Sequence, residues 1–449
     1  MTKFESNKFS AGLARLFSVA ALLLLLLPAG ARADLQGITG SSFDLTASEG
    51  FISVADGASI YAWGYSDSSE EMQLPGPTLI VTQGDTVTVT LHNQLPVAAG
   101  NVSIVFPGHT LTSVSGGVPG ALTQEASTGG TVTYEFTADQ PGTYQYHSGT
   151  QTDLQIEMGL YGALIVRPAA VHASCTGTLP YPPGIYGTPA ASAYDHADTC
   201  FDREYLFLLS EIDLQIHEAA EIQSTGPGPI VLPIGEYHSE YWLINGRAAP
   251  DTMAGRGRDI MAHQPYNSFP HMHPGDRLLM RVVGAGRDSH PFHHHGNHAR
   301  VLARDGRMLV SATDPTKLAG PLVFTIPSVP GSTADAIFEW TGKGLGWDMY
   351  GHAPGDPMEP NEDPADHGKP IPVELPGLNS LTFGGFYSGS PYLGGMGTLP
   401  PGEGGLNPNA GFAYMWHSHT EREIINNDVF PGGMLTMLLI EPPSVDIID

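Results

Sequence analysis

The chain contains the same series of segments twice, in the same order. Each copy has a turn followed by an alternating strand, then a second turn and strand, then two further strand-like runs. The matched segments are QGDTVTVTLHN (83–93) with PGDRLLMRVVG (274–284), STGGTVTYEF (127–136) with SVPGSTADAIFEW (328–340), GTYQYHS (142–148) with GFAYMWHSH (411–419), and MGLYGALIV (158–166) with PGGMLTMLLI (431–440). Such a repeat indicates two copies of one domain.

Both copies are predicted to consist of strands. The 55 glycines and 38 prolines are spread along the chain between short β-branched runs, and no long segment has the 3.6-residue apolar period of an amphipathic helix. Apolar and polar residues alternate within the runs, which is typical of a strand with one buried face in a sandwich of two sheets. We therefore expect an all-β protein with one sandwich at 34–170 and another at 203–449.

The segment between the two copies, 171–202, is predicted to be a linker that holds a disulfide. Its Cys175 and Cys200 are the only cysteines of the chain, and two cysteines in an exported protein favour a structural disulfide over a metal or catalytic site. The second copy also carries Gly/Pro-rich insertions at about 343–411. Loops of this length are typical of lids and interface segments.

The N-terminal residues 1–33 are predicted to be a secretory signal peptide. Lys3, Lys8 and Arg15 accompany an apolar run over 16–27, and the sequence Ala-Arg-Ala ends the segment. The apolar run is too short to span a bilayer. We expect an exported protein, periplasmic or extracellular, and its net charge of −27 argues against nucleic acid or an anionic membrane as partner.

Two histidine clusters occur at equivalent ends of the repeats. In SHPFHHHGNH (289–298), His293 and His295 lie two residues apart, so on a strand they share a face while His294 points away. In WHSHTERE (416–423), His417 and His419 share a face in the same way. These pairs are predicted to converge on one point.

His147 in YQYHSGT takes the corresponding place in the first copy. Neutral imidazoles arranged in this way suit copper or zinc, and copper is favoured by its higher affinity and by an oxidising exterior. The alternative is that the histidines fill hydrogen-bonding positions at strand ends. Two H-x-H pairs at the same end of related strands favour a metal site, although imidazoles alone do not exclude zinc.

These segments resemble the copper motifs of multicopper oxidases. HPFHHHGNH (290–298) is similar to the H-P-x-H-x-H-G-H motif, and HSH (417–419) followed by PGGM is similar to the terminal H-C-H…G-M motif. The length resembles that of two-domain laccases and copper nitrite reductases. The resemblance implies two cupredoxin-like Greek-key β-sandwich domains, copper as cofactor, and a homo-oligomer, with a trimer favoured.

The position of the type 1 copper departs from the family pattern. Relatives place a cysteine between the last two histidines, where this chain has Ser418. His290 matches one type 1 histidine, but Glu423 stands where the later one is expected. Since a hydroxyl cannot replace a soft thiolate, the resemblance implies that the usual electron entry site is missing.

The ligands of the oxygen-reducing copper cluster are also fewer than in the family. VFPG (105–108) stands in place of H-W-H-G, with His109 just beyond, and HSG (147–149) keeps one histidine of H-S-H. Residue-by-residue matching leaves His147, His293, His295, His417 and His419 as metal ligands, with His290 and His298 as further candidates. Glu421 and Glu423 are candidates to orient ligand histidines, or else they belong to a solvated charge run.

The leading functional hypothesis is an exported copper-binding oxidoreductase. Because His147 belongs to the first domain and the other ligands to the second, the site is expected at a domain interface, which in two-domain relatives lies between neighbouring subunits. An external electron donor or a small-molecule substrate would then act directly at the copper. The alternative is a non-catalytic scaffold that stores copper or serves as a structural and interaction module.

Overall fold

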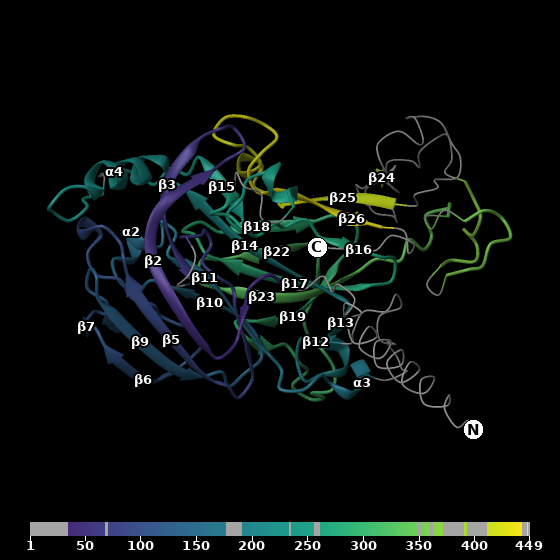
Figure 1. Ribbon diagram of the computed structural model, residues 1–449. Helices are drawn as coiled ribbons and strands as arrows, with labels where there is room; N and C mark the ends of the chain where they lie inside the picture. The colour runs from purple at the N-terminus through teal and green to yellow at the C-terminus, as the bar shows by residue number, and fades with distance from the viewer. Residues whose placement is uncertain are drawn as a thin grey trace, which may run out of the picture.

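The computed structural model describes residues 35–67, 71–176, 191–232, 235–255, 261–348, 350, 352–359, 362–370, 390–392, 411–441 and 447. The predicted signal peptide lies outside the described residues, and the predicted insertions are described only in part. The chain forms two β-sandwiches side by side (Figure 1), with the first coloured purple to blue and the second teal to yellow. The prediction of an all-β fold with two sandwich domains is confirmed.

The first sandwich has a five-stranded sheet in the order β3-β2-β5-β9-β6 and a four-stranded sheet in the order β1-β4-β11-β10. A small two-stranded sheet pairs β7 with β8. The strands are β1 (Ile38–Thr39), β2 (Ser42–Ser53), β3 (Ser59–Asp67), β4 (Leu79–Thr82), β5 (Thr86–Asn93), β6 (Leu111–Gly116), β7 (Val118–Pro119), β8 (Gln124–Glu125), β9 (Thr131–Thr137), β10 (Gly142–His147) and β11 (Tyr161–Arg167).

The second sandwich has one sheet in the order β15-β14-β17-β23-β19-β20, with β21 beside β19, and another in the order β16-β26-β25-β18-β22, with β24 beside β25. Its strands are β14 (Arg203–Ile212), β15 (Tyr241–Ile244), β16 (His271–Met272), β17 (Arg277–Gly284), β18 (His290–His294), β19 (Ala299–Arg304), β20 (Arg307–Met308), β21 (Leu322–Val323), β22 (Thr325–Ser328), β23 (Thr333–Glu339), β24 (Ser390–Tyr392), β25 (Gly411–Ser418) and β26 (Leu435–Ile440).

The four repeated segments form equivalent strands with equivalent partners. β5 pairs antiparallel with β9 and parallel with β2, as β17 pairs with β23 and β14. β10 and β11 form an antiparallel pair, as do β25 and β26. The internal repeat in the sequence is therefore a repeat of strand topology as well as of residue pattern.

Burial follows the predicted alternation in the first sandwich but not throughout the second. Along β5, exposed or half-buried threonines alternate with buried apolar residues, whereas every residue of β14 and β17 is buried. The reason is that the first sandwich covers the outer face of these strands. Leu206, Leu208 and Val283 of the second sandwich lie in one apolar cluster with Ile52 and Ile165 of the first.

Polar side chains on this covered face are paired across the boundary between the sandwiches. Arg281 is fully buried, and its Nε donates to Glu204 at 2.6 Å. Its Nη1 donates to the Thr143 hydroxyl of the first sandwich at 2.9 Å and lies 3.4 Å from Asp335. Arg167 also donates to Glu204 at 2.8 Å. Buried charges need such partners, and here the partners come from both sandwiches.

The linker holds the predicted disulfide between Cys175 and Cys200, whose Cα atoms are 5.4 Å apart. Two further strands, β12 (Ala191–Ser192) and β13 (Cys200–Phe201), pair in this region. Tyr194 donates a hydrogen bond from the linker to Asp335 of the second sandwich. The backbone N–H of Asp202 also donates to the Arg277 carbonyl at 2.8 Å, so the linker is attached to the second sandwich by both backbone and side chains.

The largest described helix is α4 (Leu214–Ser224), which lies over the first sandwich near β3 (Figure 1). Its N-cap Asp213 accepts hydrogen bonds from the backbone N–H groups of Gln215 and Ile216. The shorter helices are α2 (Thr152–Gln155), α3 (Ala173–Thr176), η2 (Val97–Ala99), η3 (Ala197–Thr199), η4 (Asp251–Met253) and η6 (Glu421–Glu423). Within the described residues, no helix is long and apolar enough to cross a membrane.

Candidate metal centre

The pairing of β18 with β25 brings the two H-x-H segments together. In this antiparallel pair His293 lies directly opposite His417, and His295 follows just beyond the end of β18. Among the described residues, His293, His295 and His417 form a group whose candidate ligand nitrogens all lie within 4.8 Å of one another. Sequence spacing therefore predicted a cluster that strand pairing assembles.

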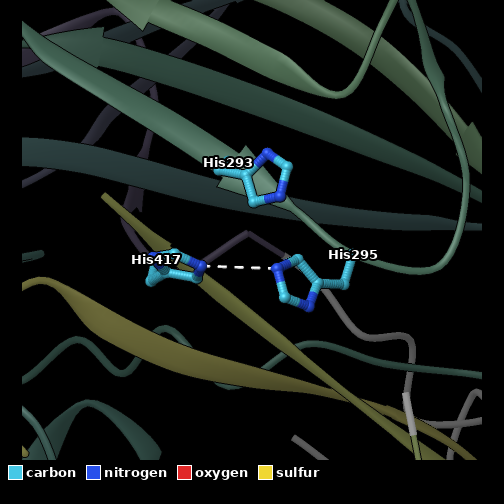
Figure 2. Close-up of side chains that lie close together, drawn as sticks. All are labelled: His293, His295 and His417. Carbon is cyan, nitrogen blue, oxygen red and sulfur yellow. Dashed lines mark hydrogen bonds between the residues drawn. The ribbon is translucent and has the colours of Figure 1, made fainter. Parts of the chain in front are cut away.

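The three rings surround a common point (Figure 2). The ring centroid of His293 lies 4.7 Å from that of His295 and 5.4 Å from that of His417. The Nε2 atoms of His417 and His295 are 3.3 Å apart. His419 lies at the rim, with its ring 4.8 Å from that of His293. The predicted pair of His417 and His419 thus shares one side of the strand.

The remaining contacts of these rings favour the neutral form that binds metal. Nδ1 of His417 donates to the Ser418 carbonyl at 2.7 Å; a carbonyl only accepts, so this contact leaves Nε2 as the ligand nitrogen. Nδ1 of His293 is held by the Thr325 hydroxyl at 2.9 Å. Burial, followed by the nearby histidines, lowers the pKa of His293 to about 4, and burial lowers that of His417.

Residues on the other face of the two strands pack into the core of the sandwich. His294 is fully buried, with its ring 5.8 Å from Trp416 and 5.9 Å from Phe338. Burial lowers the pKa of His294 to about 3, so this ring is a neutral core residue. Trp416 donates from its indole nitrogen to the His295 carbonyl at 3.0 Å. The predicted orientation of His294 away from its neighbours is confirmed.

Two other predicted site residues are not part of this group of three. Nδ1 of His419 contacts Glu421 at 3.1 Å, and both side chains are more than half exposed. His298 packs on Phe324 with ring centroids 5.1 Å apart and lines a surface pocket of about 850 Å³. His298 is thus outside the group of three described above.

The first sandwich contains the pairing that corresponds to His293 with His417, but one of the two histidines is replaced by Val105. Val105 and His147 exchange both backbone hydrogen bonds, at 2.8 and 3.2 Å, so Val105 stands where His293 stands in the second sandwich. Nδ1 of His147 donates to the Ser148 carbonyl at 2.9 Å, as Nδ1 of His417 does to Ser418. His147 thus has the orientation of a ligand histidine but is not in the group of three within this chain.

Comparison with known proteins agrees with this description. Residues 62–171 match the multicopper oxidase family model. Multicopper oxidase MCE of Talaromyces pinophilus is 39% identical over 98 residues, which cover 21% of this chain and 15% of that protein. Copper resistance protein A of Pseudomonas syringae pv. tomato is 39% identical over 94 residues, with the same two coverages. These matches support assignment of the chain to the multicopper oxidase superfamily.

The likeness to solved structures extends over most of the chain. A copper nitrite reductase from Nitrosomonas europaea aligns with 91% of this chain and 98% of its own, at a TM-score of 0.50 and 17% identity. This similarity shows the shared double cupredoxin-like fold. The matching multicopper oxidase family implies copper binding. The matching segments of the curated relatives are short, at about 15% of their length.

The residues that match the type 1 copper ligands of multicopper oxidases form a buried ion-pair network here. Nδ1 of His290 and the Ser418 hydroxyl both donate to Oε2 of Glu423, the first at 2.9 Å. Nε2 of His290 donates to Glu211 at 2.8 Å. Both ring nitrogens of His290 thus contact carboxylates. Oε2 of Glu423 is the point where the side chains of His290, Ser418 and Glu423 converge. Glu423 orients His290 and Ser418 in these contacts.

His290 is expected to stay protonated well above neutral pH. Burial lowers its pKa, but Glu211 and Glu423 outweigh burial and raise it to about 9, compared with 6.5 in an unfolded chain. Asp288 and Arg287 are the other charges nearby. Because the folded pKa is the higher one, this group's contribution to stability is complete below pH 6.5 and is lost as pH rises to about 9.

The protonation state of His290 can be measured from the NMR shifts of its ring nitrogens in the metal-free protein. These shifts are expected to remain those of an imidazolium up to about pH 9, while the free energy of unfolding declines above pH 6.5. A midpoint for His290 below 6.5 would contradict the ion-pair assignment. His92, which pairs with one carboxylate at the surface, is the internal comparison.

The sequence alone did not point to Glu211. It lies on β14, 79 positions before His290, in the run REYLFLLSEI, where two acidic residues in a buried strand were the available signal. A buried carboxylate requires a partner. His290, which matches a type 1 copper histidine, is that partner for Glu211.

Proposed function

We propose that this chain is an exported copper protein in which His293, His295 and His417 bind copper, with His419 at the rim of the site. The observation that carries the proposal is the convergence of the three rings, with the Nε2 atoms of His417 and His295 only 3.3 Å apart. Two nitrogens bound to one ion at about 2.0 Å each lie about 3 Å apart. The donor set therefore fits a metal ion with little rearrangement.

Copper is favoured over zinc for two reasons. Superfamily membership implies copper, and among divalent ions copper binds imidazole sites most tightly. The rings of His293 and His417 favour the neutral form, because burial and the neighbouring histidines lower the pKa of His293 to about 4 and burial lowers that of His417. No proton has to be released from them near neutral pH when the ion binds.

A second copy of the chain is proposed to complete the site. His147 has its Nδ1 fixed to a carbonyl, is half-buried in the first sandwich, and is not in the group of three histidines of the same chain. A neighbouring subunit can bring its own His147 to the cluster of the first, as implied by the resemblance to trimeric two-domain relatives. Metal binding and assembly would then be linked.

The activity that fits this site best is an oxidoreductase reaction that takes electrons directly from an external donor. Copper supplies a redox couple and a Lewis acid for oxygen, a peroxide or a small oxyanion. His293 and His417 position the ion, and Thr325 and the Ser418 carbonyl fix the orientation of their rings. Relay through a type 1 copper is not part of the proposal, because His290 is engaged by two carboxylates.

Copper storage or a structural role is the second candidate. The observation in its favour is the contact of His290 and Ser418 with Glu423. These residues stand where relatives hold the type 1 copper that accepts electrons. Storage predicts copper that is retained without turnover. Oxidase activity predicts steady consumption of oxygen and of a small reductant such as ascorbate by the copper-loaded protein.

The test is metal analysis with electron paramagnetic resonance on wild-type protein and the His417→Ala variant. Wild type is expected to hold about one copper per chain at this site, and the variant less than about a tenth of that. The His92→Ala variant, which removes an exposed histidine bonded to Asp44, is the matched control. Equal metal content in wild type and His417→Ala would refute the site, and rapid oxidation of phenols by wild type would refute the missing electron entry.

Export is supported by the N-terminal segment and by the Cys175–Cys200 disulfide, since such bonds persist in oxidising compartments. Secreted protein is expected to begin at Asp34. N-terminal sequencing of the mature protein checks this position, and a chain that keeps residues 1–33 would contradict it.

A further inference from the structure

Four metal-binding side chains also meet in the region after β23, where the sequence predicted a Gly/Pro-rich insertion. They are Asp348, His352, Glu362 and His367, and their candidate ligand atoms all lie within 4.8 Å of one another. The cluster shares no residue with the histidines on β18 and β25. Its described surroundings contain turns without helix or strand, so packing of regular elements does not account for it.

The segment is fixed to the second sandwich at the base of the cluster. Leu345, Trp347 and Tyr350 are buried in the core of that sandwich. The carboxylates lie directly against this anchor, with the Asp348 side chain fully buried and that of Glu362 2% exposed. The imidazoles of His352 and His367 are 17% and 16% exposed. The carboxylates are therefore inaccessible to solvent, while the edges of the two imidazoles reach it.

Backbone groups orient both carboxylates. The oxygens of Asp348 accept from the N–H groups of Tyr350 and Gly368, each at 2.8 Å. One oxygen of Glu362 accepts from the N–H of Glu359 at 2.9 Å. The histidines approach the remaining side of these carboxylates, so the two arms of the loop are held around one point.

The four histidine–carboxylate separations in the cluster are compatible with a tetrahedral site. Nδ1 of His352 lies 3.4 Å from Asp348 and 3.2 Å from Glu362. Nδ1 of His367 lies 2.6 Å from Glu362 and 3.9 Å from Asp348. Four ligands at about 2.0 Å from one ion, in tetrahedral geometry, lie about 3.4 Å apart. The observed distances scatter around that value.

We propose that these four side chains bind a divalent transition metal, with zinc the ion that fits best. Two imidazoles and two carboxylates are common zinc ligands, and the doubly positive ion balances the two buried carboxylates while the imidazoles stay neutral. The site closes the loop from Asp348 to His367 onto the sandwich. It is a structural site and is independent of the copper chemistry proposed above.

The test uses full-length protein with His293→Ala and His417→Ala, so that the β18–β25 site does not contribute. After chelation and refilling with Zn²⁺ alone, equilibrium dialysis is expected to find about one zinc per chain. Adding His352→Ala and His367→Ala should abolish this zinc, whereas adding His92→Ala should leave it unchanged. Zinc is also expected to slow proteolytic cleavage within 341–370.

The Glu362→Gln variant guards against loss of folding, because it keeps the size of the side chain. Zinc affinity should fall at least about tenfold in this variant, with the circular dichroism spectrum unchanged. Zinc content that does not respond to these substitutions, or protein that binds no zinc with all four side chains intact, would overturn the proposal. The cluster would then be two histidine–carboxylate ion pairs.

Discussion

Replacing Arg281 with alanine is expected to lower the free energy of unfolding by about 3 to 5 kcal/mol. The guanidinium is fully buried and contacts Glu204 and Asp335 as well as the Thr143 hydroxyl. Removing it leaves two buried carboxylates with an incomplete set of partners at the boundary between the sandwiches. Urea unfolding followed by tryptophan fluorescence measures the loss.

The Lys317→Ala variant is the control for this loss, because it breaks an ion pair with Asp314 that is largely exposed. Its effect should be much smaller than that of Arg281→Ala. Burial raises the pKa of Glu204, but Arg281 and Arg167 outweigh burial and lower it to about 2. The difference between wild type and Arg281→Ala should therefore shrink as pH falls from 4.5 towards 2. Similar losses in both variants would refute the role assigned to the buried network.

Replacing Ser418 with cysteine and Glu423 with histidine is expected to create a blue copper site. His290 and the Ser418 hydroxyl both donate to the same oxygen of Glu423, so the three side chains converge. Met434, from the PGGM segment, is fully buried, and its carbonyl accepts a hydrogen bond from the backbone N–H of Ser418. Two histidines, a thiolate and a weak methionine ligand are the ligand set of such sites. The variant should bind about one further copper per chain and absorb intensely in the visible range.

The matched control pairs Glu423→His with Ser418→Ala, which restores the second histidine but supplies no thiolate. It should stay colourless when loaded with copper, since the intense absorption arises from the copper–thiolate bond. Steady oxidation of a phenol by the blue variant, absent in wild type, would show that the electron entry site is what the natural chain lacks. A cysteine variant that binds copper without colour would refute the convergence of these positions.

Much of the fold and part of the site could be predicted from the sequence for local reasons. The two-residue period of a strand placed His293 and His295 on one face and His294 on the other, and the repeat placed His417 in a related strand. Strand pairing then set His293 opposite His417. The same correspondence identified Val105 as the residue that stands in place of a ligand in the first sandwich.

The rest depended on contacts between distant segments. Full burial of β14 and β17 comes from the neighbouring sandwich, which strand periodicity does not encode. Glu211 reaches His290 from another strand. The cluster of Asp348 and His367 lies in irregular backbone, where no period relates one side chain to the next, so its spacing matches no motif.

Trp416 has a consequence for how β25 tolerates sequence change. Its indole is fully buried and bonded to the His295 carbonyl, while the adjacent His417 faces the cluster. Inserting or deleting one residue before this point would exchange the two faces together, placing the indole among the imidazoles and a histidine in the core. The strand therefore tolerates no change in length before this point, so that variation by insertion is restricted to the loops on either side.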